Sequence, residues 1–310
     1  MQRILSRGEI ETLDHTAIPR FRMPERASVF ADRAARLRQL AQGSAISGYL
    51  SLMAQLADAQ QVALAGFSAP PAPEARISLA QSHGLPPLQA AGWQRDPSWR
   101  GVLRGLLDHM AAAPGAPAQA VEVCAALKAR LEDHPASLET MADALLAGRD
   151  DEVDGAMAPF VMAALQVYWT DLSSRFDARQ LPVVAPFGVC PVCGSLPVAS
   201  VVRVGGQQDG CRYLCCPLCA TEWHLVRVVC SHCEQTKDIA YHSIEGGPDA
   251  IKAESCGHCH VYRKIFYQEK DLYVEPVADD LASLALDVLM GEEGYSRASG
   301  NPMLWQAAGN

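Results

Sequence analysis

Four Cys-x-x-Cys pairs in the second half of the chain carry the clearest chemical signal. Twenty-two residues separate the first pair from the second, and the same number separates the third from the fourth. Each cysteine of the first two pairs recurs 40 residues later, which indicates an internal repeat of one small module. The pairs are Cys190 and Cys193, Cys216 and Cys219, Cys230 and Cys233, and Cys256 and Cys259.

Cysteines with this spacing are typical of metal sites. Two residues between cysteines let a tight turn aim both sulfurs at one ion, and two such turns close a tetrahedral thiolate site. The intervening 22 residues suffice for a hairpin, although they slightly exceed the usual zinc spacing. The sequence therefore predicts two metal ions, the first held by Cys190, Cys193, Cys216 and Cys219, the second by Cys230, Cys233, Cys256 and Cys259.

The residue types alone leave the metal open. Four thiolates hold zinc or iron about equally well by geometry, as in a zinc ribbon or a rubredoxin-like site. A two-iron, two-sulfide cluster is less expected with this hairpin pattern. A site closed by four cysteines has no open position for a substrate, so its role is predicted to be structural or electron-transferring.

Three cysteines lie outside the repeat. Cys215 could replace its neighbour Cys216 as a ligand, but only Cys216 fits the 40-residue offset. We interpret Cys211 and Cys215 as buried or spare thiols, and Cys124 as a core residue of a helix.

Charge and composition narrow the function classes. The net charge is −9, and residues 186–275 hold fewer Lys and Arg than Asp and Glu, so zinc ribbons that grip nucleic acid are disfavoured. The sequence contains no run of 18 apolar residues, so we predict no membrane span. Glu9, Glu11 and Asp14 occupy the place of a signal's apolar region, so we expect a cytoplasmic protein whose clustered cysteines bind metal rather than form disulfides.

The first 180 residues have helical periodicity and only one cysteine. Prolines in residues 68–73 predict an extended linker, and residues 181–188 resemble a domain junction. Asp96 before Pro97 predicts a sharp helix start. The expected helices cover residues 26–42, 46–64, 97–110, 118–132, 137–146 and 157–176, and the last is apolar enough to lie deep in a bundle.

After the junction, short β-rich runs predict small sheets, followed by one helix over residues 278–290. The expected strands cover residues 198–204, 223–229, 240–244 and 261–267. The predicted fold is multidomain: an N-terminal all-α helical domain (1–180), two tandem rubredoxin-like or zinc-ribbon-like small β metal-binding modules (181–228 and 229–275), and a C-terminal helix and tail (276–310).

Motifs of known enzymes are missing from the sequence. It contains no Walker A loop, no Gly-x-Ser-x-Gly, no His-Glu-x-x-His and no Gly-x-Gly-x-x-Gly. We therefore predict no catalytic residues and no enzyme activity.

Several motifs around the cysteines are distinctive: Cys190-Pro-Val-Cys-Gly194, Gly210-Cys-Arg-Tyr-Leu-Cys-Cys-Pro-Leu-Cys219, Cys230-Ser-His-Cys233, Glu254-Ser-Cys-Gly-His-Cys259 and Asp280-Leu-Ala-Ser-Leu-Ala-Leu-Asp287. In these motifs the chain resembles the formate dehydrogenase accessory protein FdhE family. The resemblance is most specific from about residue 181 onward, and the helical part matches in character only.

The resemblance implies a cytoplasmic, chaperone-like assembly factor for formate dehydrogenase maturation. It implies that the partner is the catalytic subunit of that enzyme, and that rubredoxin-type iron is the metal, with zinc as the alternative. A rubredoxin-like electron carrier is the second hypothesis. The sequence leaves homo-oligomer formation open.

Overall fold

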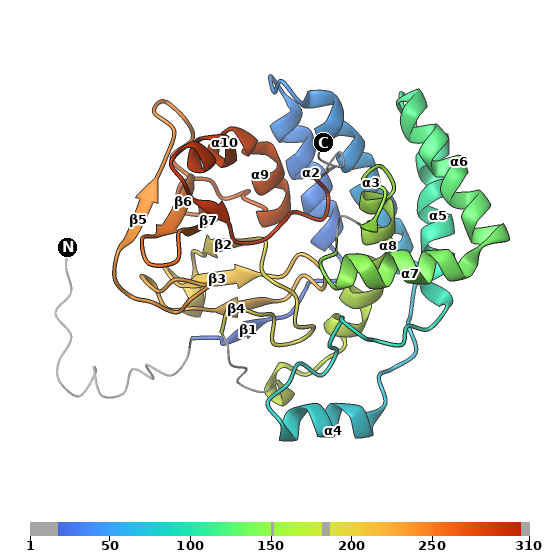
Figure 1. The fold of residues 1–310 in the computed structure, drawn as a ribbon, viewed down its shortest axis with the longest axis horizontal. Coiled ribbons are helices and arrows are strands. Elements are labelled where there is room, and N and C mark those ends of the chain that lie inside the picture. The colour runs from blue at the N-terminus through green and yellow to red at the C-terminus, as the bar shows by residue number, and fades with distance from the viewer. Residues whose placement is uncertain (1–17, 150–151, 182–186, 305–310) are drawn as a thin grey trace.

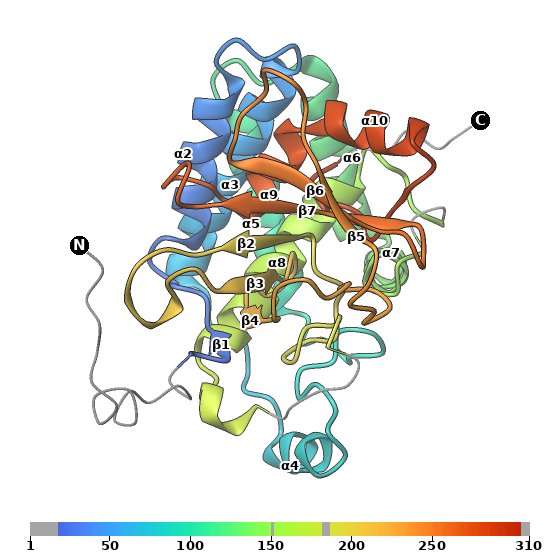
Figure 2. The ribbon, with the colours of Figure 1, turned by 90° about the vertical axis from the view of Figure 1, so that its left-hand side faces the viewer.

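The computed structural model describes residues 18–149, 152–181 and 187–304. Helices gather on one side of the molecule and a twisted sheet on the other (Figure 1). A view turned by 90° shows the strands of both repeats side by side, with helices behind them (Figure 2).

The helical part is built around one buried helix, α8. Its side chains are buried on nearly every face, including Phe160, Leu165 and Trp169, as the apolar sequence predicts. It packs against α3 and α5. The helices before it are α2 (Val29–Ala41), α3 (Ser47–Gly66), α4 (Glu74–Ser82), α5 (Ser98–Ala112), α6 (Ala118–Asp133) and α7 (Pro135–Leu146), and α8 covers Ala158–Ser174.

Six of these helices match the predicted ones to within three residues at either end. The start of α5 confirms the predicted cap, because the Oδ1 atom of Asp96 accepts a hydrogen bond of 2.9 Å from the Ser98 backbone N–H. The seventh helix, α4, was not predicted, because none of its residues is buried and it has no apolar stripe.

Both cysteine repeats contribute to one mixed sheet. Its strands are β1 (Phe21–Arg22), β2 (Ala199–Val202), β3 (Arg212–Cys215), β4 (Glu222–His224), β5 (Ile239–His242), β6 (Ile251–Cys256), β7 (Val261–Tyr267) and β8 (Ser296–Arg297). The first repeat gives the antiparallel meander β2–β3–β4, and the second gives β5–β6–β7. Parallel pairing of β2 with β7, with Ser200 opposite Ile265, joins the two meanders. The backbone hydrogen bonds between β2 and β7 therefore join the two modules into one sheet.

Two details of the strand prediction are wrong. The run over residues 223–229 is a strand only to His224, since the chain turns at Val228, which has a φ of 60°. Strands β1, β3, β6 and β8 were not predicted. Strands β1 and β8 have two residues each, and β3 and β6 carry polar residues and end in a cysteine.

The predicted C-terminal helix is two helices. Helix α9 (Pro276–Ala282) ends at Ser283, and α10 (Leu284–Glu292) follows at once. The Ser283 hydroxyl donates to the Asp279 carbonyl at 2.7 Å, a local bond that competes with the helical pattern and accompanies the break. Helix α9 packs against α2, whereas Leu286 and Met290 of α10 cover the second module.

One hydrophobic core runs without a break from the helices into the first metal module. It contains all four cysteines of the first predicted site together with Leu165 and Trp169 of α8. A separate small cluster lies under α10 and includes Ala253 and Tyr262 of the second module. The first module is therefore folded onto the helical part, and the second is attached mainly through the sheet.

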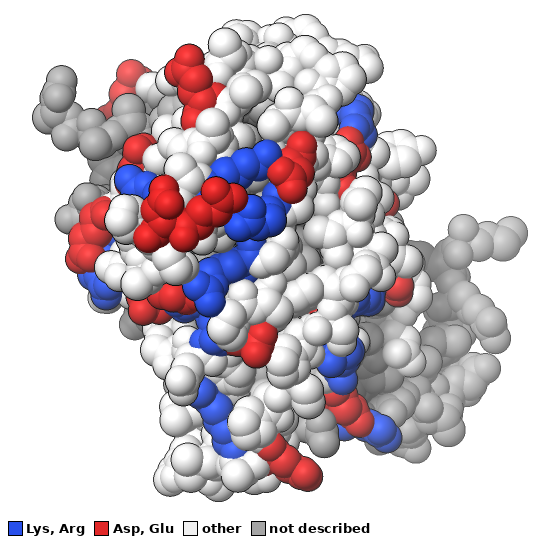
Figure 3. Space-filling model, turned by 90° about the vertical axis from the view of Figure 1, so that its right-hand side faces the viewer, with Lys and Arg blue, Asp and Glu red and all other residues white. Residues whose placement is uncertain are grey.

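The surface near α5 and α6 carries charges of both signs. The Nη1 atom of Arg104 lies 3.0 Å from a carboxylate oxygen of Glu132, and the Lys128 Nζ lies 2.5 Å from one of Asp108. On the face drawn in Figure 3, basic and acidic side chains lie next to one another, with large uncharged areas beside them. In the described part of the chain, no helix is both long and apolar enough to cross a membrane.

Candidate metal centres

The structure brings the eight predicted cysteines together in two groups of four. In each group, the four sulfurs all lie within 4.8 Å of one another. In the first group, Cys190 Sγ lies 3.5 Å from Cys219 Sγ, and Cys193 Sγ lies 3.4 Å from Cys216 Sγ. In the second group the corresponding distances are both 3.7 Å, from Cys230 to Cys259 and from Cys233 to Cys256.

These distances fit a tetrahedral ion. Metal–sulfur bonds of about 2.3 Å place the four sulfurs roughly 3.8 Å apart. They do not fit disulfides, whose sulfurs lie about 2.05 Å apart. The cysteines are free. Each group could therefore hold one metal ion.

The backbone conformation at one position is the same in all four Cys-x-x-Cys turns. The residue after the second cysteine has a positive φ in all four turns: 77° at Gly194, 57° at Ala220, 61° at Glu234 and 54° at His260. Only one of the four is glycine, and the left-handed conformation costs other residues roughly 1 kcal/mol. The turns hold this strain in the same place four times, as expected where a ligand geometry is fixed.

Helix α8 and the segment before α5 hold the first site in place. The Ser173 hydroxyl donates to the Cys219 carbonyl at 2.9 Å, and the Gln166 side chain donates to the Pro217 carbonyl at 2.8 Å. On the other side, the Leu88 and Ala90 backbone N–H groups donate to the carbonyls of Val192 and Cys193. The turns of this site are thus bonded directly to the helical part.

The two sites differ in what surrounds the sulfurs. The Ser195 hydroxyl lies 3.4 Å from Cys193 Sγ, and the Thr221 hydroxyl lies 3.2 Å from Cys219 Sγ. Both hydroxyls follow a second cysteine by two residues, a signal present in the sequence that our prediction missed. The corresponding residues of the second site, Gln235 and Val261, carry no hydroxyl. A hydroxyl at this distance can donate to a thiolate, so two sulfurs of the first site have a neighbouring hydroxyl that those of the second site lack.

Exposure also separates the sites. All four cysteines of the first site are buried, whereas Cys233 and Cys259 of the second are only partly buried. The histidines within the knuckles of the second repeat, His232 and His258, are exposed. The second site is therefore the more open to solvent.

Because the first site is buried, its cysteines can all be ionised only when a cation lies among them. Removal from water raises the pKa values of the Cys190 and Cys216 thiols well above the usual range. Desolvation also opposes ionisation of Cys193, but hydrogen bonds from the neighbouring thiols outweigh it and lower its pKa. Four thiolates can share this space only with a positive ion among them.

Two of the three cysteines outside the repeat are buried, as predicted. They are Cys124 and Cys215, and burial raises the pKa of the Cys124 thiol to about 11. Cys211 is partly exposed. Cys215 is not part of the four-sulfur group that contains Cys216.

Comparison with known proteins identifies relatives along the whole chain. Three family models match: FdhE, N-terminal (residues 18–185), FdhE, central domain (189–227), and FdhE, C-terminal domain (228–304). Protein FdhE homolog of Cronobacter sakazakii is 44% identical, with 99% of each chain covered. Protein FdhE of Salmonella typhimurium is 42% identical, with 97% of this chain and 96% of the relative covered.

A solved structure is also similar. The crystal structure of the FdhE protein from Pseudomonas aeruginosa superposes with a TM-score of 0.82 at 39% sequence identity. The match covers 93% of this chain and 99% of that one. The overall architecture described above thus has an experimental counterpart.

Proposed function

Because this chain belongs to the FdhE family, we propose that it is an accessory protein needed for the maturation of active formate dehydrogenase and that it binds the catalytic subunit of that enzyme. The observation that carries the proposal is the similarity to FdhE proteins over nearly the full chain, across all three family domains. The maturation role is inferred from the family name.

The eight repeated cysteines are the proposed metal ligands, with one ion in each group. Iron is the first choice and zinc the alternative, since four thiolates accept either. When bound, the ion supplies a fixed cross-link between two turns and, if it is iron, a one-electron redox couple. The surrounding residues keep the turns in register, and the Ser195 and Thr221 hydroxyls lie within reach of the Cys193 and Cys219 sulfurs, to which they can donate once these sulfurs are thiolates.

A non-enzymatic role agrees with the chemistry of these sites. Four protein sulfurs fill a tetrahedral ion and leave no position at which water or a substrate could be activated. We therefore propose a binding role in the cytoplasm, with units at residues 1–180, 181–228, 229–275 and 276–310. Measurement of the molar mass in solution tests whether the protein forms a homo-oligomer.

The test is purification of the tagged protein from its own cells under gentle conditions. We expect the formate dehydrogenase catalytic subunit in the eluate, and its loss from a Cys216→Ser variant. The matched control is Cys124→Ser, which changes a buried cysteine outside both groups. Intact formate dehydrogenase activity in cells that lack the gene would contradict the proposed role.

Electron transfer is the second candidate function. The partial exposure of Cys233 and Cys259 favours it, because electrons pass more readily from a metal near the surface. A reversible visible absorption change of an iron-containing preparation would support this candidate. A preparation that contains only zinc would exclude it.

A further inference from the structure

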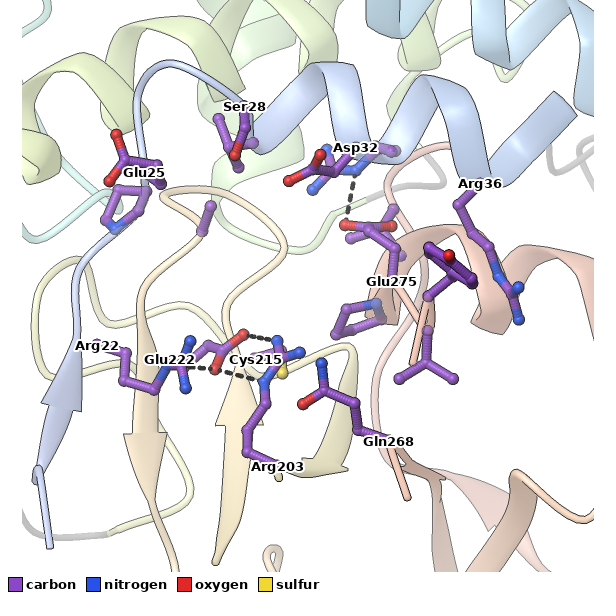
Figure 4. Close-up of a pocket in the computed structure, with 18 of the residues that line it drawn as sticks. Arg22, Glu25, Ser28, Asp32, Arg36, Arg203, Cys215, Glu222, Gln268 and Glu275 are labelled. Carbon is purple, nitrogen blue, oxygen red and sulfur yellow. Dashed lines mark hydrogen bonds and ion pairs between the residues drawn. The ribbon is translucent and has the colours of Figure 1, made fainter. Parts of the chain in front are cut away.

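A cavity of about 670 Å³ lies where the helical part, the first metal module and the C-terminal segment meet. Its walls come from α2, from strand β4 and the turn before it, and from residues 268–277 (Figure 4). Cys216 and Ala220 line it, so one turn of the first metal site forms part of the wall. The volume is in the range of binding pockets in proteins.

Four arginines line the cavity, and each already has a carboxylate partner. Glu222 pairs with both Arg22 and Arg203 (Figure 4). The Nε atom of Arg33 lies 3.0 Å from Glu275. Arg36 forms a forked pair with Asp279 and also contacts Asp271. An anionic ligand would have to compete with these carboxylates for every guanidinium group.

Two acidic groups of the cavity lining have no basic partner in the described part of the chain. The carboxylates of Glu25 and Asp32 are exposed at the α2 side and form no ion pair with any described residue. The Nη1 atom of Arg33 also donates no hydrogen bond within the described residues, but it is buried beyond the reach of a molecule in the cavity. Glu25 and Asp32 are therefore the charged groups of the lining with which a ligand can pair.

Part of the cavity lining is apolar. Leu272 and Tyr273 line the cavity and are 64% and 73% exposed. Exposed side chains of this size beside a cavity are typical of surfaces that contact another molecule. The cavity thus offers both free negative charge and exposed apolar side chains.

We propose that this cavity binds an extended, basic peptide segment of a protein partner. An arginine or lysine of the segment pairs with Glu25 and Asp32. Apolar neighbours in the segment contact Leu272 and Tyr273. This inference rests on the proposed function, because the partner is then the protein whose maturation the chain assists.

The experiment uses the full-length, metal-loaded protein and a fluorescein-labelled peptide, Ala-Leu-Arg-Leu-Ala-Arg-Leu-Ser. Two matched peptides carry Gln or Glu in place of both arginines. Fluorescence anisotropy should show saturable binding of the basic peptide that weakens as salt is added, and weaker binding of both matched peptides. Equal affinity for the basic and the Gln peptides would overturn the proposal.

Variants locate the site. Glu25→Gln combined with Asp32→Asn should weaken binding of the basic peptide about fivefold, as expected for two partly exposed ion pairs. The control, Glu122→Gln with Asp133→Asn, removes two exposed charges from α6, outside the cavity lining, and should bind as the parent does. Parent-like binding by the Glu25 and Asp32 variant would refute the site.

The outcome can be separated from that of the proposed function. Suppose the parent protein retains the catalytic subunit on purification but binds none of the peptides. The inference about the cavity then fails and the proposed function stands. If the basic peptide binds and the variants weaken it, while no formate dehydrogenase subunit copurifies, the cavity remains a peptide site and the proposed partner is wrong.

Discussion

Arg212 on β3 donates from Nη2 to Oε1 of Glu254 on β6, at 2.6 Å, with both side chains almost completely buried. The pair joins the first cysteine repeat to the second across the parallel strands that lie between them. Arg212 also donates to the Ser200 hydroxyl and to the Val229 carbonyl, so its guanidinium group is well satisfied. Nearby Arg263 is buried as well, and burial together with the charge of Arg212 lowers its pKa to about 9. Glu254 is thus the carboxylate that balances two buried cations.

Replacement of that carboxylate should be severe. Glu254→Gln leaves Arg212 buried without its counter-charge, and removal of one partner of a buried pair typically lowers the free energy of unfolding by about 3 kcal/mol. Urea unfolding of the metal-loaded protein measures the change. Asp108→Asn, which breaks an exposed pair with Lys128, is the control and should leave the midpoint nearly unchanged. A Glu254 variant as stable as that control would show that the pair does not hold the repeats together.

The two metal sites should release their ions at different rates. The second site has two partly exposed cysteines and no hydroxyl beside its sulfurs, whereas the first is fully buried. A chelator should therefore remove one ion per chain in a fast phase and the other in a slow phase, as followed by metal analysis of samples taken over time.

Ligand variants assign the phases. Cys233→Ser should eliminate the fast phase and Cys193→Ser the slow phase, and each variant should retain one ion per chain. Release in a single phase, or two ions retained in either variant, would contradict the assignment of sites.

Gly188 should not tolerate a side chain. A Cβ atom at this position would lie 2.3 Å from the Ser231 carbonyl oxygen, where the start of the first module touches the first turn of the second. Because backbone atoms must move, we expect Gly188→Ala to lower the free energy of unfolding by about 1–3 kcal/mol. Gly101→Ala is the matched control, since that helical position has no atom within 4 Å of the new Cβ and alanine favours the helix. The prediction fails if both variants melt at or above the parent temperature.

The two four-cysteine groups could be predicted from the sequence because each of their cysteines is marked by residue type and spacing alone. The long helices were predictable for a similar reason, as α5 and α8 carry periodic apolar residues and clear starts. The pairing of β2 with β7 was not, because strands far apart in sequence meet only through tertiary packing. The same holds for the cavity, whose walls come from both ends of the chain, and for the buried partnership of Arg36 with Asp279.

Stability should fall at alkaline pH partly through Tyr213. Burial raises the pKa of this phenol to about 12, and its hydroxyl donates to the Pro19 carbonyl at 2.8 Å. In the unfolded chain the phenol loses its proton near pH 10. Between about pH 10 and 12 the folded state therefore binds more protons than the unfolded state, so the free energy of unfolding decreases as the pH rises through this window. Below pH 10 both states are protonated and the effect vanishes.

Tyr213→Phe tests this relationship. The variant loses one hydrogen bond, which should cost about 1 kcal/mol at every pH, but its stability should decline less steeply above pH 10 than that of the parent. Burial also raises the pKa values of Tyr241 and Tyr262, so the decline is reduced rather than eliminated. Urea unfolding at a series of alkaline pH values gives the slopes. A Tyr213→Phe variant that keeps the slope of the parent would show that this phenol is not the group that titrates.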